Sequence, residues 1–193
     1  MLPLAAWLLL CTGNAERCCN RLNIHRGYLA AGSLFFLFAS QLESTLLDCI
    51  KVNYGALFLF AVAVAVAACH KNERLIAVLF SVFSGLVAFL ALRYAYDAKT
   101  PAFIVAAPAL FCAFFLMQDA KSQMLLVLLA PMFYGACLAI EEACMFGRFA
   151  LTIGTQTQLE ALTLGIVLLP ILWLIDSVFR RALAKVRRGR TAG

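Results

Sequence analysis

The sequence has little charge for its length: 13% of its 193 residues are charged and 64% are hydrophobic. A soluble globular domain carries about 25% charged residues. A chain this small also cannot bury so much apolar surface inside a fold that faces water. Together with the mean hydropathy of +0.92, these values exclude an ordinary soluble domain and predict a protein whose solvent is lipid.

Histidine is scarce as well, since only His25 and His70 are present. Neither lies in an HExxH sequence, which excludes zinc hydrolases of that class. Walker A, GxGxxG and GxSxG sequences are absent, as is the paired-aspartate motif of membrane phosphotransferases. We therefore expect no catalytic residues, no metal and no cofactor, and an enzyme acting on lipids ranks only third among the functions considered.

What the sequence does contain is a series of apolar runs separated by short charged segments. Most of them reach or approach the ~20 residues needed to cross ~30 Å of hydrocarbon. Because backbone groups in lipid must be satisfied internally, the sequence predicts an all-α, polytopic transmembrane helix bundle. Six runs are clear: Gly27–Leu47, Tyr54–Cys69, Leu75–Leu92, Pro101–Met117, Met124–Ile140 and Leu159–Ile175.

A seventh run, residues 1–11 (MLPLAAWLLLC), is short for a span. It lacks the positive residues that begin a secretory signal, so we expect a short or tilted first span, with a misplaced start codon as the other explanation. With this segment the bundle has six full spans plus a short one, seven in all, and its N-terminus lies outside. Without it there are six spans and the N-terminus lies inside.

Lysine and arginine predict the orientation of the bundle. If the C-terminus is cytoplasmic, twelve of the 16 basic residues fall on the inner side, as the positive-inside rule requires. The outer side then holds Lys51, Arg93, Lys99 and Arg148. The versions with six and seven spans place the same loops inside, so both give the same orientation.

A basic tail, residues 180–193, follows the transmembrane domain of residues 1–179. Each basic residue near an anionic leaflet contributes ~1 kcal/mol, so we expect the tail to lie on the cytoplasmic membrane surface against anionic lipids. Because the positive-inside orientation already accounts for these basic residues, we expect no nucleic-acid partner. The basic residues of the tail are Arg180, Arg181, Lys185, Arg187, Arg188 and Arg190.

Two adjacent carboxylates, Glu141 and Glu142, follow the fifth clear run, in the sequence LLAPMFYGACLAIEEACMFGR. A carboxylate at a helix C-terminus faces the negative end of the helix dipole. Three explanations are open: the helix continues past the pair, Arg148 pairs with Glu141, or one carboxyl stays protonated as part of a proton or cation site. A simple exit from the membrane is the favoured interpretation, and a functional acidic site is the alternative.

Glu43, with Gln41 close by, lies inside the first clear run. If one helix extends to Leu47, Glu43 sits about one turn below the outer surface and is the best-buried carboxylate in the chain. An ionisable group within the membrane is a functional hypothesis by default, and we expect Arg93 or Arg148 as its partner. A helix that ends earlier gives Glu43 no such role. The candidate ligand or ion site comprises Gln41, Glu43, Glu141, Glu142 and Arg148.

Polar residues at the ends of other runs predict helix caps. Thr157 and Glu160 match a capping box that opens the last span, which accounts for Glu160 without a functional role. Ser122 is a further candidate cap. Cys49 and Cys144 both fall near the predicted outer face, and whether they pair depends on their distance.

Three segments suggest a family resemblance: LPLAAWLLL near the start, LLAPMFYGACLAIEE, and IGTQTQLEALTLG at the entry to the last span. In these segments and in its layout, the chain resembles the YphA-like membrane proteins of endospore-forming bacteria. The resemblance implies a multi-pass protein of the bacterial cytoplasmic membrane and transfers no catalytic residues.

We expect a non-enzymatic assembly, regulatory or structural membrane component, with the lipid bilayer and other membrane proteins as partners. The alternative is a small-solute-binding or transporter subunit, similar in size and span number to the substrate-binding components of vitamin-uptake transporters. In that case Glu43, Glu141, Glu142 and Arg148 face a pocket that opens outward. Acidic side chains converging on a cavity favour the alternative, and a solid bundle favours the assembly role.

Overall fold

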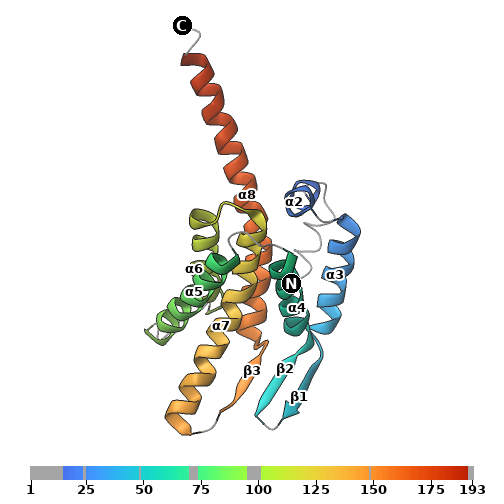
Figure 1. The fold of residues 1–193 in the computed structure, drawn as a ribbon, viewed down its shortest axis with the longest axis vertical. Helices are drawn as coiled ribbons and strands as arrows, with labels where there is room; N and C mark the ends of the chain where they lie inside the picture. Colours follow the sequence, from blue (N-terminus) through green and yellow to red (C-terminus); the bar gives the residue numbers. More distant parts are fainter. Residues whose placement is uncertain are drawn as a thin grey trace.

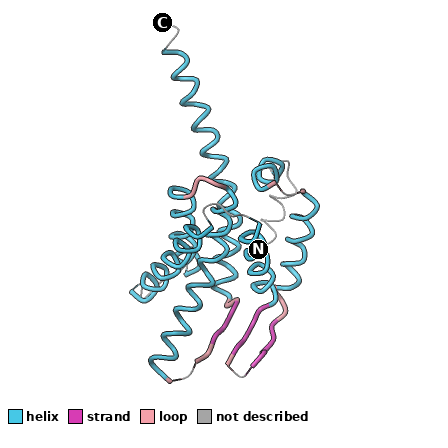
Figure 2. Tube along the Cα trace, viewed as in Figure 1, coloured by secondary structure: helices cyan, strands magenta, loops and turns pink. Residues whose placement is uncertain are grey.

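The computed structural model describes residues 15–23, 25–47, 49–69, 74–94, 101–147 and 149–190. Most of these residues are helical, and three short strands join them at one end (Figure 2). The helices are α2 (Ala15–Leu22), α3 (Arg26–Ala39), α4 (Tyr54–Cys69), α5 (Arg74–Tyr94), α6 (Pro101–Leu116), α7 (Ala120–Phe146) and α8 (Gln156–Arg190). The strands are β1 (Glu43–Leu47), β2 (Ile50–Asn53) and β3 (Leu151–Ile153).

Helix α7 forms the centre of the bundle, because it contacts α4, α5, α6 and α8. Its residues from Leu125 to Pro131 are all buried. The strands gather at one end of the molecule, whereas α2 and the far end of α8 lie at the other (Figure 1). The two ends of the bundle therefore differ in structure: the strands lie at one end and the short helix α2 lies at the other.

Three helices are long and apolar enough to cross a membrane: Arg74–Tyr94, Ala120–Phe146 and Gln156–Phe179. Tyr54–Ala68 and Pro101–Leu116 are shorter apolar helices. The prediction of a helical membrane protein is thus confirmed at this level. The number of spans stays a prediction, and residues 1–14 lie outside the described part of the chain.

Several predicted boundaries agree with the structure. Helix α4 covers the predicted run Tyr54–Cys69, and α5 and α6 differ from theirs by one or two residues at an end. Helix α7 is longer than predicted and continues past Glu141 and Glu142. It is bounded by Asp119, whose side chain accepts hydrogen bonds from two backbone N–H groups, and by Gly147 in the left-handed conformation. The first of the three explanations for the carboxylate pair is therefore correct.

The first clear run is not one helix, so the expectation of a span reaching Leu47 is wrong. Helix α3 ends at Ala39, and the hydroxyl of Ser40 donates to the carbonyl oxygen of Leu37 at 2.9 Å. Beyond it β1 pairs antiparallel with β2, and β2 pairs parallel with β3. Ser40 favours this ending, because a serine side chain can hydrogen-bond the nearby backbone.

Helix α8 continues without interruption through the predicted tail. Its 35 residues make it about 52 Å long at 1.5 Å per residue, which exceeds the thickness of a hydrocarbon core. Residues 180–190 extend the helix beyond the rest of the bundle (Figure 1). The predicted division at residue 179 thus falls inside one helix, and contact of the tail with anionic lipids stays a prediction.

We predict that Gly85→Ala destabilises the bundle by roughly 1–3 kcal/mol through overpacking. A Cβ there would lie 2.8 Å from the Cβ of Phe133 and from the backbone nitrogen of Tyr134, so α5 and α7 would have to separate. The free energy of unfolding in detergent measures the effect. Gly32→Ala is the matched control, since its Cβ would meet Phe58 at an ordinary 3.6 Å. Equal stability of the two variants would contradict close α5–α7 packing.

Candidate functional site

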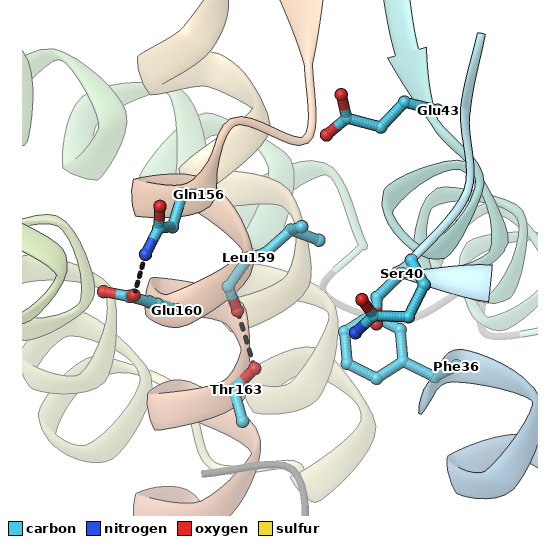
Figure 3. Close-up of a pocket in the computed structure, with 8 residues that line it drawn as sticks. Phe36, Ser40, Glu43, Gln156, Leu159, Glu160 and Thr163 are labelled. Carbon is cyan, nitrogen blue, oxygen red and sulfur yellow. Dashed lines mark hydrogen bonds between the residues drawn. The ribbon is translucent and has the colours of Figure 1, made fainter. Parts of the chain in front are cut away.

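A cavity of about 420 Å³ lies between the end of α3 and the start of α8 (Figure 3). Because Glu43 of β1 belongs to its lining, the cavity lies near the end of the bundle that carries the strands. Its described lining includes two carboxylates and no lysine, arginine or histidine. The lining residues are Phe36, Ser40, Gln41, Glu43, Gln156, Leu159, Glu160 and Thr163.

The wall formed by α3 and β1 is positioned by Asn53. The side-chain amide of Asn53 donates to the carbonyl oxygen of Ser40 at 2.9 Å. Asn53 is also the β2 partner of Glu43 in the sheet. Glu43 is exposed, so the expectation of a carboxylate buried within a span is wrong, because the helix ends before it. The carboxylate instead extends from β1 toward the start of α8 (Figure 3).

The wall formed by α8 begins with a capping box, but not the predicted one. The hydroxyl oxygen of Thr155 accepts from the backbone N–H of Gln158 at 3.3 Å. The amide oxygen of Gln158 accepts in return from the backbone N–H of Thr155 at 3.0 Å. This reciprocal pair is the capping-box arrangement, two residues earlier than Thr157 and Glu160. Glu160 is therefore not required as a cap and lines the cavity.

The hydroxyl and amide groups around the cavity present mainly acceptors. Thr163 donates its hydroxyl proton to the carbonyl oxygen of Leu159 at 2.6 Å, and Ser40 donates to Leu37. The amide nitrogen of Gln156 donates to a carboxylate oxygen of Glu160 at 3.0 Å. Since ionised carboxylates can accept hydrogen bonds but not donate them, the cavity is best suited to a molecule that donates hydrogen bonds.

The other predicted acids do not reach this cavity. Glu141, on α7, forms an ion pair with Arg93 at the end of α5, so Arg93 pairs with Glu141 rather than with Glu43. Glu142 is exposed and does not line the cavity. Arg148 lies outside the described residues. The structure thus brings together Gln41 and Glu43 of the predicted set and separates them from Glu141 and Glu142.

Sequence reasoning missed Gln156, Glu160 and Thr163 as cavity residues. Their spacing of four and three residues places them on one face of a helix. A polar stripe at the start of an otherwise apolar span is a signal that the sequence contains. From the sequence, Glu160 is explained as a helix cap, and this explanation leaves no reason to assign it to a binding site.

Neither a disulfide nor a cluster of metal ligands occurs at this end of the described structure. Cys49 and Cys144 are both exposed free thiols, so the disulfide considered for them is not formed. Across the described ranges, no three His, Cys, Asp or Glu side chains gather closely enough to hold a metal ion.

Comparison of the chain with protein-family models, with curated proteins and with solved structures finds no match. The resemblance to YphA-like proteins therefore stays a prediction.

We predict that the Arg93–Glu141 pair contributes below about 1 kcal/mol to stability, as exposed ion pairs do. Arg93 is half exposed, with 50% of its side chain accessible to solvent, so water and salt screen the pair. A double-mutant cycle with Arg93→Gln and Glu141→Gln measures the coupling, and Glu142→Gln with Arg93→Gln is its control. A coupling above about 2 kcal/mol would instead indicate a desolvated pair.

Proposed function

We propose that this chain is a non-enzymatic, multi-pass protein of the cytoplasmic membrane that binds a small organic cation in the cavity between α3 and α8. This is the alternative function considered from the sequence. The observation that carries it is that Glu43 and Glu160 both line one cavity whose described lining contains no cationic residue. A cavity lined by acidic side chains is the feature that favours solute binding over an assembly role.

The chemistry of the lining supports a cation that carries N–H donors. Two carboxylates without a compensating charge in the described lining favour a positively charged solute. The hydroxyl protons of Ser40 and Thr163 are engaged with backbone oxygens, which leaves their lone pairs for a donor. Phe36 and Leu159 add an apolar part to the lining. An ammonium or guanidinium group on a short aliphatic chain matches these features.

The volume supports an organic molecule over a bare ion. Ligand pockets usually measure about 300–1,000 Å³, and this cavity, at about 420 Å³, lies at the lower end of that range. A bare inorganic ion would occupy only a small part of it.

The distribution of charge supports an outward-facing cavity. Residues Arg21, Arg26 and Lys121 belong to α2 and to the starts of α3 and α7. Helix α2 and the starts of α3 and α7 lie at the end of the molecule away from the strands (Figure 1). Under the positive-inside rule that end is cytoplasmic, together with the C-terminal tail. With α3 to α8 as six spans, and residues 1–11 as a short seventh, the cavity opens to the outside. This orientation is compatible with the resemblance to YphA-like proteins of the bacterial membrane.

We predict that 1,4-diaminobutane binds the purified protein and that Glu43→Gln or Glu160→Gln weakens binding by about tenfold or more. A hydrogen bond to a charged group contributes about 1.5–3 kcal/mol, and 1.4 kcal/mol corresponds to a factor of ten. Calorimetric titration in detergent at constant ionic strength measures the Kd. Butane-1,4-diol, which has the same carbon chain without the charges, is the ligand control.

Glu142→Gln is the matched protein control, because Glu142 is an exposed carboxylate outside the cavity lining. It should leave the Kd unchanged. Native mass spectrometry of the protein released from its own membrane gives an independent measurement, with a stoichiometric cation expected and lost in both cavity variants. If neither method detects a bound cation, or if binding survives both substitutions, the proposed function is wrong.

A further inference from the structure

Trp173 is one of two tryptophans in the chain, and it is buried on α8 with 5% of its surface exposed. Its indole N–H donates to the side-chain oxygen of Gln123 on α7. The amide nitrogen of Gln123 donates to the carbonyl oxygen of Met117 at 2.7 Å. The polar atoms of both side chains are therefore paired, which holds the indole ring in one orientation relative to the start of α7.

Helix α2 contacts this fixed ring through Arg21. The guanidinium carbon of Arg21 lies 5.6 Å from the centre of the Trp173 ring, within the range of a cation–π interaction. Cys19 and Leu22 are buried on the same short helix. Helix α2 is thus attached to the bundle by apolar contacts and by one cationic side chain that reaches α8.

Helix α2 is also attached closely to α3. Leu22 ends α2 and Arg26 begins α3, so only three residues join them. The ring nitrogen Nδ1 of His25 accepts from the backbone N–H of Gly27 at 3.2 Å and caps α3. A displacement of α2 is therefore transmitted to α3.

These contacts join the two helices that form opposite walls of the cavity. Helix α3 packs on α2 and α4, whereas α8 packs on α6 and α7. Phe36 is ten residues from the start of α3, and Thr163 is ten residues before Trp173. At 1.5 Å per residue, the attachment lies about 15 Å from the cavity along each helix. Helix α2 therefore fixes the spacing of α3 and α8 at the end opposite the cavity.

We propose that Arg21, Trp173 and Gln123 are positioning residues for the cavity: through α2 they set the separation of α3 and α8 and so the affinity for the solute. This inference rests on the proposed function. None of the three residues lines the cavity, so they act on the solute only through the two wall helices. Solute binding at one end of the bundle is then coupled to the environment of Trp173 at the other.

The test uses the full-length chain carrying Trp7→Phe, in which Trp173 is the sole tryptophan. Titration with 1,4-diaminobutane should shift the emission of Trp173 with the midpoint of the calorimetric Kd. An exposed cation–π contact contributes about 0.5–1 kcal/mol, so Arg21→Gln should weaken binding by about two- to fivefold. Arg21→Lys retains the cation and should restore most of the affinity.

Arg74→Gln is the matched control, because it removes an exposed cation from the start of α5 without a contact to Trp173. An emission response, weakened binding in Arg21→Gln and parental binding in Arg74→Gln together support the inference. An unchanged Kd in Arg21→Gln, or equal weakening in Arg74→Gln, overturns it. If either of these two results is found while binding still depends on Glu43, the inference is wrong and the proposed function is retained. Absence of binding in the parent protein rejects both.

Discussion

Two buried side-chain amides at helix starts hold the cavity end of this molecule together. Backbone N–H groups at the start of a helix have no partner within it, and next to lipid an unpaired group costs several kcal/mol. The amide oxygen of Asn53 accepts from Gly55 and Ala56 at the start of α4, and its nitrogen reaches back to Ser40 on the end of α3. The amide oxygen of Gln158 accepts from the backbone N–H groups of Gly154 and Thr155 just before α8. Both residues are almost fully buried; Asn53 joins the end of α3 to the start of α4, and Gln158 packs against Gly135 of α7.

These amides lie where the start of α8 comes close to α7 and to the start of α4, and two glycines leave room for them. Gly154 adopts φ +87° and leaves no room for a Cβ, which would lie 2.6 Å from the Cβ of Asn53. A Cβ on Gly135 of α7 would collide with the side chain of Gln158. The start of α8 is therefore held between α7 and the α3–α4 turn. Side chains that follow it, including Leu159 and Thr163, line the cavity between α8 and α3. The proposed solute site is a consequence of how three helices end and begin.

The sheet explains why the carboxylates are accessible. A span continuing from Ala39 to Leu47 would place Glu43 in hydrocarbon, where an ionised carboxylate is costly. Ending α3 early and pairing β1 with β2 moves Glu43 to an exposed position, where water can hydrate its carboxylate. The opposite end of the bundle has no strand among its described residues, and it is there that α2 contacts α3 and α8. The proposed binding site and the proposed positioning residues thus occupy different ends of the same two helices.

The sequence by itself indicated a helical membrane protein and the boundaries of α4, α5 and α6, because a helix that crosses lipid needs an apolar run of span length bounded by charged residues. The run Tyr54–Cys69 coincides with α4, and Gln41 and Glu43, the candidate site residues of the first clear run, line the cavity. Only the tertiary structure decided that α3 stops at Ala39, that Glu160 lines the same cavity as Glu43, and that Glu141 pairs with Arg93. The first and last of these outcomes involve contacts between residues far apart in the chain, Asn53 with Ser40 and Arg93 with Glu141. Local periodicity contains no record of such contacts, because they exist only once the helices are packed.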